Sequence, residues 1–326
     1  MGTISSFIYS QIFVSLPKPS DNYKGKTILV TGSNVGLGKE AARHFVRLGA
    51  STVILAVRSL DKGEAAKLDI LKTTKVKGDV IKVWHLDMAK YQSVIDFAAR
   101  CEKELGRLDI ALLNAGVAHM GFEMAEQDES TITVNVVCTF LLALLLVPKL
   151  KATANETNSR TNLTITASEV HKWAKFPQKS APIGGIFDKL NADNGKADMQ
   201  DRYQVSKLLE VFVVRAMAER RSATQIPITI NCVNPGLCHS ELAREAGFHF
   251  TIMKFLLARS TEVGSRTLVH AASQGAETHG QYMSDCRIDM VATLVQSKEG
   301  YDLQNRVWDE LAAKLEKIKP GVTRLL

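Results

Sequence analysis

Cysteine is scarce in this sequence, and no two cysteines have the spacing of a metal-binding pair. The chain of 326 residues contains five, an odd number without a Cys-x-x-Cys motif. They are Cys101, Cys138, Cys232, Cys238 and Cys286. The eight histidines show no ligand spacing such as His-Glu-x-x-His either. We therefore expect no metal site, no disulfide framework and a reducing, cytoplasmic location.

Long hydrophobic runs are also lacking. A helix needs about 20 consecutive apolar residues to cross a bilayer, whereas the longest apolar run here covers residues 140–147. Residues 7–16 are mildly apolar, but Ser10 and Gln11 interrupt them and no basic segment precedes them as in a signal peptide. We expect no transmembrane segment. Residues 1–24 are interpreted as an extension that packs on the body of the protein, with contact to a membrane surface as the alternative.

Charge of one sign is not concentrated anywhere in the chain. The formal net charge is +7, but the Lys and Arg residues are scattered and form no dense run. This argues against a nucleic-acid partner, and it is compatible with an anionic cofactor. Apolar residues make up 45% of the chain and charged residues 23%, the balance of an ordinary globular protein.

What the sequence does contain is a regular alternation of short β-branched runs and longer helical patterns. The predicted strands are residues 26–31, 52–57, 80–85, 108–113, 162–166, 226–233 and 281–283. The predicted helices are residues 36–48, 60–74, 91–105, 127–151, 204–221 and 261–273. This alternation predicts one α/β domain with a doubly wound parallel sheet of about seven strands and helices on both faces.

A glycine-rich turn directly follows the first predicted strand. Residues 31–38 read Thr-Gly-Ser-Asn-Val-Gly-Leu-Gly and lead into the first helix of the alternating pattern. The free N–H groups and the dipole of a helix N-terminus attract phosphate, and glycine lets the backbone approach it closely. We interpret this turn as a pyrophosphate site rather than as a turn without a ligand. The candidate residues are Gly32, Ser33, Asn34, Gly36, Leu37 and Gly38.

The tip of the second strand indicates which nucleotide binds. An acidic residue at this place holds the ribose hydroxyls in NAD enzymes, but here the strand ends in Arg58 and Asp61 comes three residues later. A guanidinium matches the geometry of a 2′-phosphate, and Lys39 adds positive charge nearby. We therefore predict a preference for NADPH; the alternative is that Arg58 simply faces solvent.

A single Tyr-x-x-x-Lys motif, Tyr203 and Lys207, lies in a predicted helix. A spacing of four residues places both side chains on one helix face. The pKa of an unperturbed tyrosine is about 10, and a nearby ammonium lowers it toward the range in which the phenol exchanges protons at neutral pH. The motif thus predicts an acid–base pair for carbonyl reduction.

The GxxxGxG spacing of the turn, and the Tyr-x-x-x-Lys motif after it, resemble the short-chain dehydrogenase/reductase family over roughly residues 25–285. The resemblance implies a Rossmann-type fold, NADP(H) as cofactor and catalytic roles for Ser168, Tyr203 and Lys207, with Thr166 as the fallback for Ser168. It also implies that Asn135 holds a water in a proton relay; an Asn that bends a helix is the alternative. Further cofactor contacts are implied for Asp87, Met88, Asn114, Ala115, Gly116, Pro235, Gly236, Leu237 and Ser240.

Three segments lie outside these motifs. An insertion at residues 169–201 makes the chain similar to retinol-dehydrogenase-like members and to fungal secondary-metabolite reductases. The stretches TASEVHKWA and NPGLCHSEL are especially similar to the fungal reductases. The apolar residues of the insertion line the substrate site or form a packed loop; they are Trp173, Phe176, Pro177, Ile183, Ile186 and Phe187. Residues 241–260 are expected to form a substrate lid or a dimer contact. Residues 286–326 are a helical tail in which 302–318 packs back on the domain.

These features predict an NADPH-dependent reductase or dehydrogenase acting on the ketone, or the alcohol, of a fairly large apolar small molecule. A place in secondary metabolism and a homodimer or homotetramer are implied by the resemblance. The alternatives are a non-redox isomerase or cyclase, a retinol- or steroid-like alcohol dehydrogenase, and a nucleotide sensor. We interpret His171 and His239 as solvated histidines at the rim of the cleft, with substrate contact as the alternative.

Overall fold

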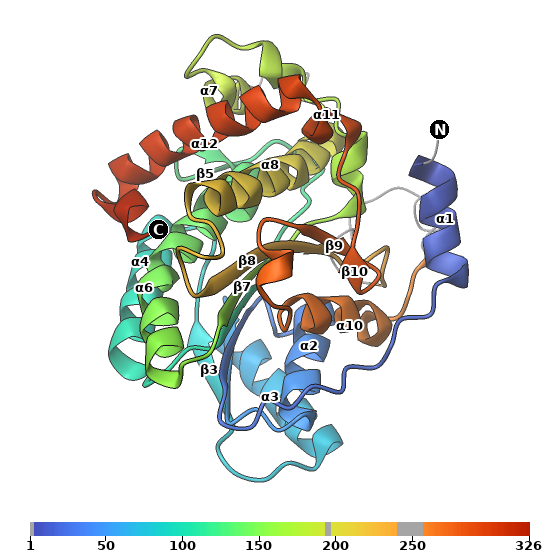
Figure 1. The fold of residues 1–326 in the computed structure, drawn as a ribbon, viewed down its shortest axis with the longest axis vertical. Coiled ribbons are helices and arrows are strands. Elements are labelled where there is room, and N and C mark those ends of the chain that lie inside the picture. Colours follow the sequence, from blue (N-terminus) through green and yellow to red (C-terminus); the bar gives the residue numbers. More distant parts are fainter. Residues whose placement is uncertain (1–2, 193–196, 240–256) are drawn as a thin grey trace.

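Eight strands form one sheet in the computed structural model, which describes residues 3–192, 197–239 and 257–326 (Figure 1). Their order is β10-β9-β8-β7-β4-β1-β2-β3, and only the pair β9 and β10 is antiparallel. The strands are β1 Thr27–Thr31, β2 Thr52–Val57, β3 Ile81–His85, β4 Ile110–Leu113, β7 Thr161–Thr166, β8 Ile228–Asn234, β9 Tyr282–Ser284 and β10 Arg287–Ile288. The predicted parallel sheet is confirmed, with β10 as an unpredicted edge strand. A separate hairpin joins β5 Met124–Ala125 to β6 Asp128–Glu129.

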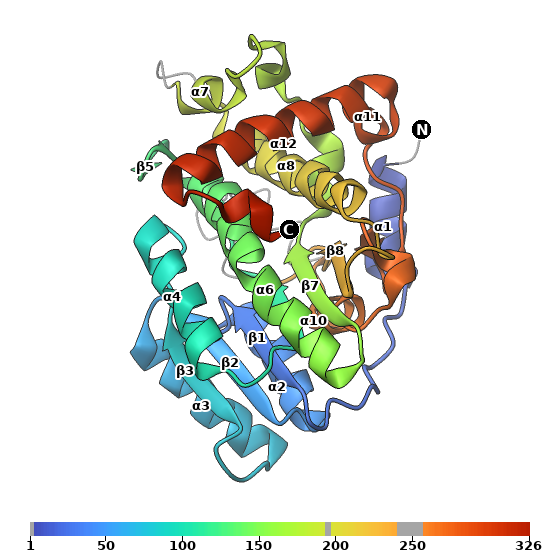
Figure 2. The same cartoon turned by 60° about the vertical axis from the view of Figure 1, so that its left-hand side comes forward.

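Helices cover both faces of the sheet (Figure 2). On one face lie α4 Tyr91–Glu104, α6 Thr139–Thr157 and α8 Met199–Arg220. On the other lie α2 Gly36–Arg47, α3 Leu60–Thr74 and α10 Thr261–Ala271. The strands are apolar throughout because both faces are covered: all residues of β1, β4 and β8 are buried. The order of the strands reverses between β1 and β4, the place where open α/β sheets bind ligands beyond the carboxyl ends of the strands.

The long helical segment before β7 is more apolar than we expected. It consists of α5 Ser130–Ile132, a π-helical turn η1 Thr133–Cys138 and α6. By length and composition the helix Ser130–Thr157 is long and apolar enough to cross a membrane, although the sequence contains no uninterrupted apolar run of that length. However, 94% of its apolar window is buried inside the protein. It is a core helix that contacts α4 beside it and strands β4, β7 and β8 of the sheet.

The insertion at residues 169–201 is not a single loop, contrary to expectation. It contains η2 Glu169–Trp173, η3 Pro177–Ser180 and α7 Ile186–Asn191, and α8 already begins at Met199. Phe176, Ile186 and Phe187 are buried in the main hydrophobic core. These three side chains therefore pack in the core, as the packed alternative predicted. Ile183 is 93% exposed.

The C-terminal tail forms α11 Thr293–Gln296, α12 Lys298–Ile318 and η6 Val322–Leu325. Upstream of the tail, a short 3₁₀ helix, η5 Ala276–Thr278, precedes β9. α12 lies along α8, and its apolar stripe is buried there (Figures 1 and 2). The stripe consists of Leu303, Val307, Leu311 and Leu315. The tail thus extends the helical layer outward by one helix.

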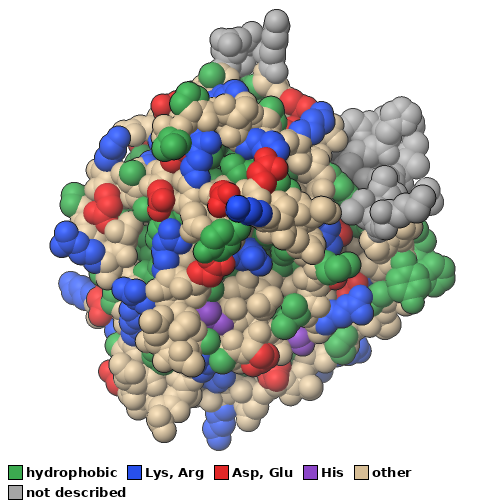
Figure 3. Space-filling model, turned by 45° about the horizontal axis from the view of Figure 1, so that its top comes forward, with side chains coloured by type: hydrophobic (Ala, Val, Ile, Leu, Met, Phe, Trp, Pro, Cys, Tyr) green, Lys and Arg blue, Asp and Glu red, His purple; other side chains and the backbone are tan. Residues whose placement is uncertain are grey.

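The N-terminal extension forms α1 Thr3–Phe13, which lies beside β10 at one side of the molecule (Figure 1). One face of α1 packs against the rest of the chain, where Phe7 lies edge-on against Trp173 with ring centroids 5.6 Å apart. The other face carries Tyr9, Ile12 and Phe13, which are 61%, 54% and 69% exposed. Figure 3 shows hydrophobic side chains gathered at the right-hand edge, on the side where α1 lies in Figure 1.

Candidate active site

The glycine-rich turn of residues 31–38 joins β1 to α2 as predicted. Gly36 adopts a φ of +60°, which strongly favours glycine, and a Cβ there would meet nothing within 4 Å. A Cβ on Gly38 would lie 2.6 Å from the carbonyl oxygen of Gly32, so the turn closes this tightly only with glycine. Val35, at the N-cap of α2, gives the helix no side-chain hydrogen bond. The first N–H groups of α2 therefore lack a side-chain cap, which fits the binding of a pyrophosphate.

Thr31 and Asn114 tie this turn to the loop after β4. The Thr31 hydroxyl accepts hydrogen bonds from the backbone N–H groups of Asn114 and Ala115, both at 2.9 Å. In return, the Asn114 amide donates to the carbonyl oxygens of Thr31 and Gly32, at 3.0 and 3.4 Å. These contacts cross the switch point of the sheet. They hold the loop of residues 114–117 against the phosphate turn.

Tyr203, Lys207 and Ser168 meet at the carboxyl end of β7. Lys207 Nζ lies 5.8 Å from the centre of the Tyr203 ring and donates a 2.8 Å hydrogen bond to the carbonyl oxygen of Thr166. The Ser168 side chain lies close enough to the Tyr203 hydroxyl to affect its pKa. Burial raises the pKa of Tyr203, whereas the charge of Lys207 and the Ser168 contact lower it. Lys207 thus acts on Tyr203 in the expected direction, but burial outweighs it.

Asn135 lies in the π-helical turn η1 and is fully buried. Its amide donates to the Val117 carbonyl oxygen at 2.9 Å and to the Ser206 hydroxyl at 3.0 Å, and its Oδ1 accepts from the Val117 N–H at 2.9 Å. A Cβ on Gly116 would lie 3.2 Å from Asn135 Oδ1 and 3.6 Å from Lys207 Nζ. The side chain of Asn135 therefore joins the loop of residues 114–117 to the helix that carries Tyr203. Its part in a water relay stays a prediction.

Comparison with known proteins agrees with this arrangement. The model of the family described as short chain dehydrogenase matches residues 26–170. The chain is 60% identical over 320 residues to the short chain dehydrogenase/reductase dmxR8 of Cryptosporiopsis sp. (strain 8999). The matched region covers 97% of this chain and 98% of that protein. It is 45% identical to the short chain dehydrogenase atnD of Emericella nidulans, over 86% of this chain and 90% of that protein.

This chain belongs to the short-chain dehydrogenase family. Solved structures show the same fold at lower identity. A structure of an uncharacterized protein from Mycobacterium paratuberculosis has a TM-score of 0.67 and 23% identity over 93% of this chain and 96% of that one. A chain described as a short chain dehydrogenase from Shigella flexneri, complexed with NADP, has a TM-score of 0.58 and 21% identity over 82% of this chain and 100% of that one.

In this short-chain dehydrogenase, the residues predicted to contact the adenine half of the cofactor differ in their exposure and in their partners within the protein. Arg58 is exposed at the end of β2, and no carboxylate of the described residues lies within ion-pairing distance of it. Lys39 instead pairs with Asp69 of α3 at 2.8 Å. Asp87 binds its own loop, accepting from the Ala89 N–H at 3.1 Å, and Met88 is buried. Of the two predicted cations, only Arg58 is available to a phosphate.

The Pro235–Gly236–Leu237 turn after β8 meets the N-terminal helix. Gly236 has a φ of +79°, and a Cβ there would lie 2.6 Å from Gln11 Oε1 and 2.9 Å from Arg259 Nη1. Arg259 forms a buried ion pair with Asp285 at 2.8 Å and donates to the Ser10 carbonyl oxygen at 2.6 Å. The extension at residues 1–24 therefore contacts the active-site end of the sheet, a role that its sequence did not indicate.

The substrate lid predicted at residues 241–260 falls mostly outside the described residues, as does Ser240. The chain on its two sides is described. Cys238 pairs with Arg259 in a parallel bridge, and the His239 N–H donates to the Arg259 carbonyl oxygen at 3.0 Å. The two ends of this segment thus lie together next to the Pro235–Gly236–Leu237 turn.

The interpretation of His171 as a solvated rim histidine is wrong. Its side chain is 1% exposed, Nδ1 contacts the Ser168 carbonyl oxygen at 2.7 Å, and Nε2 accepts from the Ala292 N–H at 3.1 Å. Burial lowers the pKa of His171 to about 4, so the ring is neutral near pH 7. Through these two contacts the ring links the backbone of Ser168 to that of Ala292. His239 is exposed, as expected.

Sequence reasoning missed one residue that the structure places at the site, Glu210; Trp173 was already a candidate for the substrate wall. Glu210 lies one turn beyond Lys207 on α8, and its Oε1 accepts a 2.8 Å hydrogen bond from Lys207 Nζ. Trp173 has a buried indole N–H with no hydrogen-bond partner among the described residues. The signal for Glu210 was available as an acid three residues after the motif lysine, but on an isolated helix such a pair is most often at the surface.

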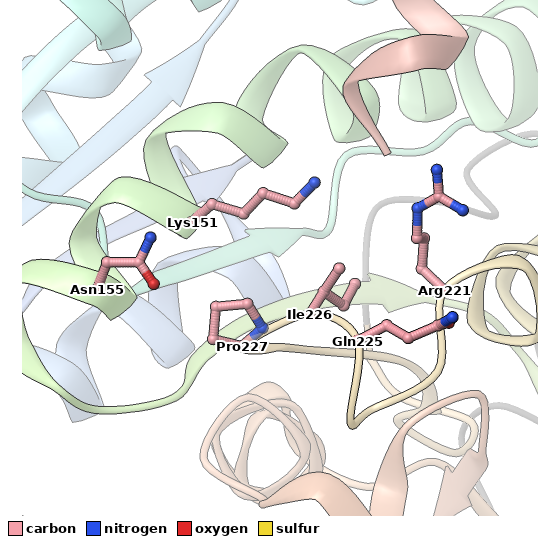
Figure 4. A pocket seen from close by; sticks show the side chains of 6 residues that line it. All are labelled: Lys151, Asn155, Arg221, Gln225, Ile226 and Pro227. Atoms are coloured by element: carbon pink, nitrogen blue, oxygen red, sulfur yellow. The ribbon is translucent and has the colours of Figure 1, made fainter.

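A separate cavity of about 460 Å³ lies at the opposite edge of the sheet, at the start of β8 (Figure 4). Its lining residues come from α6 and from the connection between α8 and β8; they are Lys151, Asn155, Arg221, Gln225, Ile226 and Pro227. Lys151 and Arg221 both donate hydrogen bonds to the carbonyl oxygen of Leu326, at 2.9 and 3.1 Å. Their charges serve to hold the C-terminal residues, so we assign no chemistry to this cavity.

Proposed function

We propose that the protein is an NADPH-dependent reductase that transfers hydride to the ketone carbon of a fairly large apolar small molecule, or removes it from the matching alcohol, in secondary metabolism. The observation that carries the proposal is the meeting of Ser168, Tyr203 and Lys207 at the carboxyl end of β7. The loop of residues 114–117 links this group to the phosphate turn, since Asn114 contacts Gly32 and Gly116 lies beside Lys207.

The side chains can supply what carbonyl reduction requires. A bound nicotinamide supplies the hydride for the carbonyl carbon. The Tyr203 hydroxyl donates its proton to the carbonyl oxygen, so that C=O becomes CH–OH, and the Ser168 hydroxyl stabilises the charge that develops on that oxygen. The Lys207 ammonium favours the tyrosinate that remains. The reverse sequence oxidises the alcohol with the same residues.

The choice of NADPH rests on Arg58. It is exposed at the tip of β2, and no acidic residue occupies that tip. A guanidinium can donate two parallel hydrogen bonds to the 2′-phosphate of NADPH. NADH lacks this phosphate and therefore gains neither hydrogen bond. The structure of the Shigella flexneri chain with NADP is consistent with this choice.

The apolar character of the substrate rests on fewer residues than the sequence suggested. Phe176, Ile186 and Phe187 belong to the core, which leaves Trp173 as the apolar side chain of the insertion near Ser168. Phe7 of α1 packs on its ring. This edge-to-face pair offers apolar ring surface suited to a ring-containing ketone. The protein is expected to work in the cytoplasm as a homodimer or homotetramer.

The experiment compares wild-type protein with Tyr203→Phe in the NADPH-dependent reduction of α-tetralone and a panel of aromatic ketones. Loss of the phenolic proton should lower kcat about a hundred- to ten-thousandfold, while the Kd for NADPH changes by less than about twofold because the ring remains. Tyr301→Phe is the matched control, since that tyrosine is half exposed on α12. Retained turnover in Tyr203→Phe, or no NADPH consumption with any ketone, would overturn the proposal.

A further inference from the structure

Glu210 belongs to the same stripe of α8 as the two motif residues. Positions 203, 207 and 210 are separated by four and three residues, which places their side chains in one row along the helix. Lys207 Nζ donates to Glu210 Oε1 and to the Thr166 carbonyl oxygen, both at 2.8 Å. The Lys207 and Glu210 side chains are only 6% and 2% exposed. The lysine that acts on Tyr203 is therefore half of a buried ion pair.

Among the described residues, Lys207 is the one cation that faces the Glu210 carboxylate. Glu210 Oε2 is buried and has no hydrogen-bond partner among those residues. The other titratable groups that feel its charge are Tyr203 on the same helix and Cys232 on β8. Burial raises the pKa of the Cys232 thiol, so that group stays neutral. Burying a carboxylate that has a single charged partner costs free energy of folding. A purely structural role would therefore destabilise the protein without a return in activity.

We propose that Glu210 is a positioning residue for the acid–base pair: it holds the Lys207 ammonium against the Thr166 carbonyl oxygen and offsets part of the ammonium's charge at the Tyr203 hydroxyl. The proposal rests on the assignment of Tyr203 as proton donor above. It adds a third member to the row, which the Tyr-x-x-x-Lys motif does not contain.

The effect of Glu210 on the tyrosine has a definite sign. Burial is the main cause that raises the pKa of Tyr203, and the Glu210 carboxylate raises it further by opposing the positive charge of Lys207. Glu210 also raises the pKa of Lys207, which keeps the buried amine protonated although burial disfavours its charge. The carboxylate thus keeps Tyr203 in its proton-donating form to higher pH, which favours the reductive direction.

The arrangement also depends on pH in its own right. Burial raises the pKa of Glu210 to about 7, even though Lys207 lowers it. Below this pH the carboxyl group is neutral and the ammonium acts on Tyr203 unopposed; above it the carboxylate offsets the ammonium. The tyrosine therefore holds its proton more firmly once Glu210 has ionised.

The deciding experiment needs neither ketone nor cofactor. The ionisation of Tyr203 is followed by ultraviolet difference spectroscopy, with each protein measured against its own Tyr203→Phe version so that the other tyrosines cancel. Glu210→Gln should increase the apparent acid dissociation constant of Tyr203 about tenfold, because the negative charge that offsets Lys207 is removed in a buried medium of low dielectric. Glu219→Gln, on the exposed side of the same helix, is the matched control and should change nothing.

Kinetics with the ketone then separate charge from position. In Glu210→Gln the alkaline fall of kcat for reduction should move to lower pH. The fold-decrease in kcat should exceed the fold-increase in KM. Glu210→Asp keeps the charge but is one methylene shorter, so it should restore the titration of Tyr203 while kcat stays low. The wild-type chain alone should show a kinetic ionisation near pH 7, which keeps the proposal testable if a variant does not fold.

Each outcome bears on one proposal only. An unchanged or decreased acid dissociation constant of Tyr203 in Glu210→Gln, with NADPH consumption intact in the wild type, would overturn the role of Glu210 and leave the reductase assignment standing. The expected tenfold change without NADPH consumption would support the role of Glu210 in the electrostatics of the site and refute the reductase assignment.

Discussion

The side chain of Gln11 binds both backbone polar groups of Leu237, although 226 positions separate the two residues in the sequence. Gln11 Oε1 accepts from the Leu237 N–H at 3.1 Å, and Nε2 donates to the Leu237 carbonyl oxygen at 2.9 Å. Nε2 also donates to the Leu257 carbonyl oxygen at 2.9 Å. The N-terminal helix thereby fixes the turn after β8 and the returning chain at Leu257 with one side chain.

Replacing Gln11 by Ala should loosen this end of the sheet. Three hydrogen bonds are lost, and two backbone groups of Leu237 lose their partner, which we expect to lower the free energy of unfolding by about 1–3 kcal/mol and the Tm by a few degrees. The Kd for NADPH should rise as well, because the Pro235–Gly236–Leu237 turn becomes mobile. Differential scanning fluorimetry and cofactor titration measure both effects. Tyr9→Ala, on the exposed face of α1, should leave both unchanged.

Arg58→Ala should abolish the preference between the two cofactors. A charge-assisted hydrogen bond contributes about 1.5–3 kcal/mol, so the Kd for NADPH should rise about 10- to 100-fold while that for NADH stays the same. Arg58→Lys should recover only part of the affinity, since an ammonium lacks the two-pronged geometry. Lys317→Ala on α12 removes an equal charge away from β2 and serves as the control. Equal affinity of the wild type for both cofactors would contradict the assignment.

Gly38→Ala should damage the phosphate turn directly. The added Cβ would sit 2.6 Å from both the Gly32 carbonyl oxygen and Asn114 Nδ2, so the backbone of the turn must shift. We expect a loss of about 1–3 kcal/mol in stability and a clear loss of cofactor affinity, measured by denaturant unfolding and fluorescence titration. Gly106→Ala is the matched control, because its Cβ would meet nothing within 4 Å. Unaltered cofactor binding in Gly38→Ala would mean that the turn does not hold the pyrophosphate.

His171 should make the protein sensitive to acid. Its pKa is lowered by burial to about 4 from the ordinary histidine value of 6.5, so between these pH values the unfolded chain binds a proton that the folded chain excludes. The free energy of unfolding should therefore fall by about 3 kcal/mol as the pH drops through this window, and stay insensitive to His171 above it. His171→Gln should flatten that part of the stability curve, whereas the exposed His239→Gln should not. An equally steep acid limb in His171→Gln would refute this account.

The parts of the site that lie close together in the chain were predictable from the sequence. The turn of residues 31–38 depends on glycine spacing within a single strand-to-helix connection, and Tyr203 and Lys207 share a face because four residues make about one helical turn. The alternation of strands and helices likewise predicted the parallel sheet, because a buried parallel strand must be apolar on both faces.

Errors arose where a short pattern was read without its neighbours. His171 resembles a polar loop residue in the sequence, but packing beneath Ser168 removes it from water. For Phe176 and Phe187 the sequence left a substrate wall and a packed loop open, and the tertiary structure places both side chains in the main hydrophobic core. The sequence predicted a helix over residues 127–151, and only the fold shows that nearly all of its apolar surface is buried in the core.

The sequence by itself determined the fold class, the phosphate turn and the tyrosine–lysine pair, because each depends on backbone geometry over a few neighbouring residues. Only the tertiary structure decided that Glu210 pairs with Lys207 away from water, that Asn135 joins the β4 loop to α8, and that Gln11 binds Leu237. The physical reason is that burial and hydrogen bonding between distant segments depend on how the helices pack on the sheet. Residue spacing along the chain does not encode that packing.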